Sequence, residues 1–209
     1  MKVFALVFLP LLLVTGSANA QSTDVTAEMP KFVGGERWEY QTTPRRINDC
    51  NPDRPFKTTI TVQSVDDDGV TLKRGNSEIK LNSSLAELQE VNGTRNTQET
   101  FNFPMVSGKK WERRRLVKMS SGGALQTDLT CEHKKSEKVT VPAGEFETIP
   151  IVCKGRWNNL AARTSDVATY TDWYSPVVKN FVKQEVVTWY RGNYCADTET
   201  VLIKFTERQ

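Results

Sequence analysis

Two pairs of acidic residues have the side-chain type that acid–base hydrolysis requires. They are Glu145 with Glu147, and Asp166 with Asp172. Glycoside hydrolysis, for example, uses two carboxyl groups held at a set separation. Spacing along the sequence does not establish that separation, so a carboxylate-based hydrolase is one hypothesis for this chain.

His133 is the only histidine, and it lies beside Lys134 and Lys135. We expect a surface residue there rather than a general base. Without a second histidine there is no ordinary Ser-His or Cys-His arrangement. The sequence also contains no G-x-S-x-G motif, no H-E-x-x-H motif and no glycine-rich phosphate loop. We therefore predict a protein that is not an enzyme and has no cofactor or metal.

The densest basic cluster consists of Arg113, Arg114, Arg115 and Lys118. We favour a solvated sheet face or a protected edge strand. The alternative is a patch that contacts anionic headgroups or a partner protein. Nucleic-acid binding is disfavoured because the formal charge is only +3 for the whole chain, or +2 without Lys2.

The first twenty residues have the features of a secretory signal peptide. Lys2 is followed by an apolar run over 3–14, and Ala18-Asn19-Ala20 is an A-x-A cleavage site. We therefore predict a signal peptide over 1–20, a flexible lead over 21–35 and one β domain over 36–209. No later run is long and apolar enough to span a membrane.

Four cysteines, Cys50, Cys131, Cys153 and Cys195, suggest disulfides in an exported chain. Their wide spacing disfavours a zinc site. Val139–Lys154 predicts a hairpin whose turn contains Pro142-Ala143-Gly144. Positions 131 and 153 are symmetric about residue 142, so we predict a Cys131–Cys153 bond, which leaves Cys50 to pair with Cys195.

The remaining elements predicted to position these residues are short antiparallel strands separated by turns. Alternating apolar residues occur in 57–65, 70–73, 79–81, 181–190 and 198–205. Ser84-Leu85-Ala86-Glu87 has capping-box spacing and predicts a single helical turn. The pattern therefore predicts a mainly β fold with at most short helices.

Three segments in this order resemble those of a family of bacterial exported proteins, the TapB-like domains of unknown function. They are FNFPMVSGKKWERR, VPAGEFETIPIVCKG and YTDWYSPVVKNFVKQE, which span 101–185. The sequence departs from the family pattern at Lys179-Asn180 and in its four cysteines. The resemblance implies a strongly curved antiparallel sheet, a half-barrel like that of the LolA and LolB lipoprotein carriers, and a periplasmic location.

In such a half-barrel the aromatic hairpin TDWYSPVVKNFVKQEVVTW, over 171–189, has two interpretations. Its rings could only hold the hairpin together, which we favour. They could also line the hollow and bind an acyl chain, with Trp173, Trp189, Phe181 and Trp111 as candidates. The leading hypothesis for function is therefore a carrier or sensor of an apolar or lipid-like ligand, and the alternative is an envelope protein-interaction or assembly module.

Overall fold

The computed structural model describes residues 24–46, 54–91, 94–118, 123–191 and 193–208, and within these ranges every regular element is a β-strand. The predicted signal peptide lies outside the described residues. No helix in the described part of the chain is long and apolar enough to cross a membrane. The strands are β1 (Arg37–Pro44), β2 (Phe56–Asp66), β3 (Gly69–Arg74), β4 (Ser77–Asn82), β5 (Glu87–Val91), β6 (Thr94–Gln98), β7 (Lys110–Lys118), β8 (Ala124–His133), β9 (Glu137–Val141), β10 (Gly144–Asn159), β11 (Thr164–Ser175), β12 (Asn180–Tyr190) and β13 (Asn193–Thr206).

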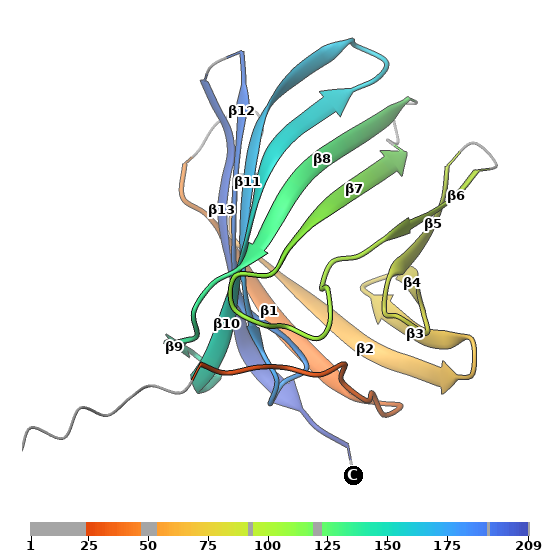
Figure 1. Cartoon of the computed structure of the whole chain (residues 1–209), viewed down its shortest axis with the longest axis vertical. Coiled ribbons are helices and arrows are strands. Elements are labelled where there is room, and N and C mark those ends of the chain that lie inside the picture. Colours follow the sequence, from red (N-terminus) through yellow and green to blue (C-terminus); the bar gives the residue numbers. More distant parts are fainter. Residues whose placement is uncertain (1–23, 47–53, 92–93, 119–122, 192, 209) are drawn as a thin grey trace, which may run out of the picture.

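The strands form one antiparallel sheet in the order β6-β5-β4-β3-β2-β1-β13-β12-β11-β10-β8-β7, and β9 pairs with the start of β10. The first and last strands, β1 and β13, pair in the middle of this order. Figure 1 shows that the sheet curls, so that β7 at one end turns toward β5 and β6 near the other. The predicted half-barrel of mainly β structure is confirmed.

Irregular pairing contributes to this curvature. The register shifts between Glu39 and Tyr40 in β1, and between Trp173 and Tyr174 in β11. Such bulges bend a strand and increase its twist. Gly155 of β10 allows a close approach to β8, because an added Cβ would lie 2.0 Å from the Asp128 carbonyl oxygen.

Two apolar clusters hold the curved sheet. The first is centred on Trp38, Tyr40 and Leu202 of β1 and β13, and the second on Ile151 and Tyr174 of β10 and β11. The segment that leads to β1 also packs on the sheet, because Ala27 is buried and forms a β-bridge with Met105. The alternation of apolar and polar residues along the strands therefore gives the sheet one buried face and one more solvent-exposed face.

The predicted helical turn near Ser84 is wrong. Asn82 accepts hydrogen bonds at its side-chain oxygen from the backbone N–H groups of Ser84 and Ala86, at 3.0 and 2.9 Å. Leu85 has a φ of 60°, outside the right-handed helical region. The Asx-type turn that begins at Asn82 binds backbone N–H groups that the capping box of a helix would have bound. The chain then continues into β5.

The predicted disulfide between Cys131 and Cys153 is confirmed. The two residues are direct partners in the β8–β10 register, and both are fully buried. The β9–β10 turn forms at Pro142-Ala143-Gly144 as predicted, but Val141 lies opposite Gly144, so the β9–β10 register is offset by one residue from the β8–β10 register. Cys195 is disulfide-bonded as well, but Cys50 lies outside the described residues, so the Cys50–Cys195 pairing stays a prediction.

Replacing both Cys131 and Cys153 by alanine should lower the free energy of unfolding by about 3 kcal/mol, the chain-entropy value for a loop of this size. The bond joins residues separated by 22 positions. Equilibrium denaturation in urea measures the change. The double variant isolates this bond, whereas a reductant would also act on Cys195. An unchanged midpoint would show that the strand pairing alone supplies the stability.

Candidate functional site

The concave face of the sheet encloses a hollow of about 490 Å³. Its walls come from β1, β2, β12 and β13 on one side and from β7 and β11 on the other, with contributions from the β3–β6 arm. The lining mixes aromatic, aliphatic and charged groups: Tyr40, Thr42, Phe56, Thr58, Ile60, Arg74, Glu87, Gln98, Thr100, Arg113, Arg115, Tyr170, Phe181, Gln184, Val186, Thr198 and Thr200.

Strand β7 divides the predicted basic patch between its two faces. Arg113 and Arg115 line the hollow, whereas Arg114 is exposed and its Nε donates to Asp128 Oδ1 at 2.5 Å. Successive side chains of a strand point to opposite faces. The solvated-face interpretation is therefore wrong for Arg113, which is only 8% exposed, whereas β7 does lie at an edge of the sheet. Lys118 ends β7, but its side chain lies outside the described residues.

Arg113 lies beside a buried carboxylate. Its Nη1 is 3.8 Å from Asp172 Oδ2, and its guanidinium lies over the Tyr170 ring at 5.9 Å from the centroid. Gln184 donates from Nε2 to Asp172 Oδ1 at 2.6 Å. Burial raises the pKa of Asp172, and the Arg113 charge and the Gln184 bond oppose that rise. For Arg113, whose charged form is the protonated one, burial lowers the pKa.

Several polar atoms around the hollow have no hydrogen-bond partner within the described protein. They are Arg113 Nε and Nη1, Arg115 Nε, Asp172 Oδ2 and Gln98 Oε1. Buried polar groups are normally satisfied, and each exception calls for a reason such as water or a ligand. The unsatisfied donors gather on the two arginines of β7.

An apolar pocket of about 110 Å³ adjoins the hollow. It is lined mainly by aliphatic side chains of β3 and β4 and by Phe32, Phe101 and Phe103. Phe181, Thr100 and Glu87 line both spaces. Phe181 also stacks on Tyr40 with ring centroids 4.6 Å apart. Phe181 therefore forms part of the wall between the mixed hollow and the apolar pocket.

Of the four aromatic residues predicted to bind ligand, Phe181 lines these two spaces and the three tryptophans do not. Trp173 donates from its indole to Glu137 Oε1 at 2.5 Å, and Lys183 Nζ lies 4.8 Å from its ring centroid. Trp189 accepts at its carbonyl from the Trp157 indole at 2.8 Å. Trp173 therefore contacts β9 through Glu137 and the return strand β12 through Lys183.

Trp111 packs against His133, with ring centroids 4.6 Å apart. His133 is fully buried, so the expectation of a surface histidine is wrong. It shares its face of β8 with Leu129 and Cys131, and the lysines that suggested exposure follow the strand end. Burial, together with the Lys109 charge, lowers the pKa of His133 from 6.5 to about 4, and the backbone of Val106 opposes this shift.

Acid should therefore destabilise the fold through His133. Below pH 6.5 the unfolded chain protonates this residue, while the folded chain keeps it neutral down to about pH 4. Stability should fall on the order of 2 kcal/mol across that interval. Denaturation at several pH values measures it, with His133→Leu as the control. If the variant lost stability as steeply as the parent, the carboxylates alone would account for acid sensitivity.

The two predicted carboxylate pairs differ in their geometry. Glu145 and Glu147 both lie near the exposed Lys138 ammonium, at 3.3 and 3.7 Å. Asp166 and Asp172 lie six residues apart on the same strand, which at about 3.3 Å per residue separates them by roughly 20 Å. The second pair is therefore too far apart to act on one bond, whereas the acids of the first pair are close together but exposed and paired with Lys138.

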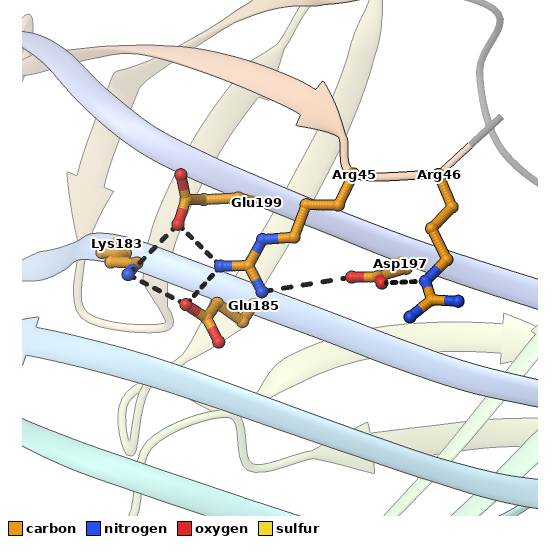
Figure 2. Close-up of polar contacts among 6 residues, drawn as sticks. All are labelled: Arg45, Arg46, Lys183, Glu185, Asp197 and Glu199. Carbon is orange, nitrogen blue, oxygen red and sulfur yellow. Dashed lines mark hydrogen bonds and ion pairs between the residues drawn. The ribbon is translucent and has the colours of Figure 1, made fainter. Parts of the chain in front are cut away.

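Figure 2 shows a charged cluster on the other face of β12 and β13. Arg45 Nη2 donates to Glu185 at 2.5 Å and to Glu199 at 2.8 Å, and Lys183 lies 2.9 and 3.1 Å from the same carboxylates. Although partial burial alone would raise the pKa of Glu185 and Glu199, the bonds from Arg45 and Lys183 lower both.

The same cluster continues at Asp197, which lies 3.1 Å from Arg46 Nε and 4.0 Å from Arg45 Nη1. Acids and bases alternate there, so charge is compensated within the protein. This network ties the chain after β1 to β12 and β13. In the hollow, by contrast, Arg113 Nε and Nη1 and Arg115 Nε have no hydrogen-bond partner within the described protein.

Comparison with solved structures supports the fold. One similar structure is a "putative lipoprotein" from Parabacteroides distasonis, with a TM-score of 0.53 and 15% identity. Another is a "putative exported protein with YmcC-like fold" from Bacteroides fragilis, with a TM-score of 0.55 and 11% identity. In each case the match covers 88% of this chain and 100% of the other. No protein-family model and no curated protein sequence matches the chain significantly.

These comparisons place the chain in a fold class shared by proteins described as exported or as lipoproteins. The described disulfides fit an exported protein.

Proposed function

We propose that this chain is a periplasmic, non-enzymatic protein that binds a lipid-like ligand on the concave face of its half-barrel. The observation that carries the proposal is the junction of two spaces. An apolar pocket of about 110 Å³ opens beside a mixed hollow of about 490 Å³, and Phe181, Thr100 and Glu87 line both.

Binding sites for small molecules combine apolar walls with a few placed polar groups. The aliphatic residues Leu72, Ile79 and Leu81 offer a surface for a hydrocarbon segment, and the hollow offers polar groups to the rest of the molecule. The order of the three TapB-like sequence segments supports an assignment to that group of exported proteins. It adds no activity, because the group has no established reaction.

Native mass spectrometry of protein purified without detergent from a periplasmic extract tests the proposal. A discrete added mass, lost on organic extraction, is the expected result. Ile79→Trp should reduce it by filling the apolar pocket, while Lys80→Trp, on the opposite face of β4, should not. A bare protein that also fails to bind added lipid would contradict the proposal and favour an envelope protein-interaction module.

A further inference from the structure

We propose that Arg113 and Arg115 form an anion-binding site in the hollow, which takes the carboxylate or phosphate group of the ligand. The inference rests on the proposed function for the apolar part of that ligand. It assigns a chemical class to the polar part, namely a singly or doubly charged oxyanion.

The first support is the state of the guanidinium donors. Arg113 is 8% exposed, yet its Nε and Nη1 have no hydrogen-bond partner within the described protein, and neither has Arg115 Nε. A buried charged donor that is left unsatisfied is costly. Two such side chains at alternate positions of one strand point to a shared acceptor in the space that they both line.

The second support is the geometry of arginine itself. A guanidinium presents its N–H groups in a planar fork that matches the oxygens of carboxylate and phosphate. Arg113 and Arg115 extend from the same face of β7 and both line the hollow. An oxyanion in the hollow would lie between two guanidinium groups, and hydrogen bonds to their buried Nε and Nη1 atoms would require the side chains to turn toward it.

The third support is the charge of the lining. Arg74, Arg113 and Arg115 line the hollow together with one carboxylate, Glu87, so the lining is formally cationic. Asp172 Oδ2 lies 3.8 Å from Arg113 Nη1, and Asp172 Oδ1 accepts a hydrogen bond from Gln184. That distance is too long for a hydrogen bond, so Asp172 partly compensates the charge of Arg113 and leaves its donors available.

Aqueous titration of three amphiphiles with one alkyl chain tests the inference: decanoate, decyl phosphate and decanol, each below its aggregation concentration. Inorganic phosphate serves as a fourth probe. Isothermal titration calorimetry should give a Kd at least about 10-fold lower for the two anions than for decanol, since hydrogen bonds to charged groups contribute about 1.5–3 kcal/mol.

Arg115→Gln is the test variant because Arg115 is less buried than Arg113, and Arg114→Gln is its matched control on the outer face of the same strand. Arg115→Gln should remove most of the preference for anions and leave decanol binding unchanged, whereas Arg114→Gln should leave all four titrations unchanged. Should Arg115→Gln fail to fold by circular dichroism, Arg115→Lys keeps the charge but lacks the fork, and it should weaken anion binding.

The outcomes separate the two proposals. Equal affinity for decanol and the anions, unchanged by either Arg115 variant, overturns the anion site and leaves the lipid-binding function standing. Binding of inorganic phosphate that depends on Arg115, without binding of any amphiphile, supports the anion site and overturns the lipid-binding function. If none of the four probes binds, both proposals are wrong.

Discussion

Replacing Trp38 by alanine should lower the free energy of unfolding by about 4 kcal/mol, the range found for large aromatic residues in a core. Trp38 is fully buried in β1. Its ring stacks on Phe205 with centroids 5.7 Å apart and meets the edge of Phe32 at 5.9 Å. Removing it would open a cavity where the first and last strands pair.

Trp38 also joins distant parts of the chain. Its indole donates to the Val178 carbonyl oxygen at 2.6 Å, and Val178 lies in the turn between β11 and β12. Trp38→Phe keeps most of the ring but leaves that carbonyl unpaired, so it should cost about 1–2 kcal/mol. Urea denaturation monitored by far-ultraviolet circular dichroism measures both variants. Equal losses for phenylalanine and alanine would show that the hydrogen bond, rather than packing, dominates.

Local rules predicted the hairpin around Pro142 and the Cys131–Cys153 bond. The two cysteines lie opposite each other only because the register changes by one residue between the β9–β10 and β8–β10 pairings. Strict symmetry about the two-residue turn would have placed Cys131 opposite Lys154. The direct pairing of the two cysteines therefore depends on a one-residue shift that the turn itself does not specify. The sheet order, with β1 beside β13, was not predictable, because that pairing joins segments far apart in the sequence.

The site was predicted less well because residue type was given more weight than strand position. Arg113 and Arg115 are basic, which favoured a wet face, but they share alternation with Trp111 and not with Arg114. His133 was placed at the surface because of its lysine neighbours, although it shares alternation with Cys131. In both cases, successive side chains of a strand point to opposite faces of the sheet, and this alternation could have corrected the prediction.

Asp172 was a further missed signal. It lies between Tyr170 and Tyr174 on one face of β11, so a charge was present between two aromatic rings. A buried charge in such a position needs a partner of opposite sign. The partner, Arg113, comes from a strand more than fifty residues earlier in the chain. Sequence reasoning could have predicted that Asp172 has a partner, but only the curvature of the sheet identifies it.

The clearest consequence of this pair is an expected asymmetry between single and double substitution. Asp172→Asn keeps the acceptor for Gln184 but removes the negative charge beside Arg113. Arg113, only 8% exposed, is then left as an uncompensated buried cation. Removing one partner of a buried ion pair costs about 3–5 kcal/mol, and we expect about 3 kcal/mol here because the hollow adjoins the guanidinium.

The double variant Arg113→Met/Asp172→Asn should recover most of that loss, because no uncompensated charge remains and a side chain of similar length fills the space. Urea denaturation of the two single variants and the double variant measures the coupling. Decanoate should stabilise Asp172→Asn more than the parent chain, because its carboxylate can replace the missing charge beside Arg113. If losses in the single variants simply add in the double variant, Arg113 and Asp172 act independently, and the carboxylate does not hold the arginine at the wall of the hollow.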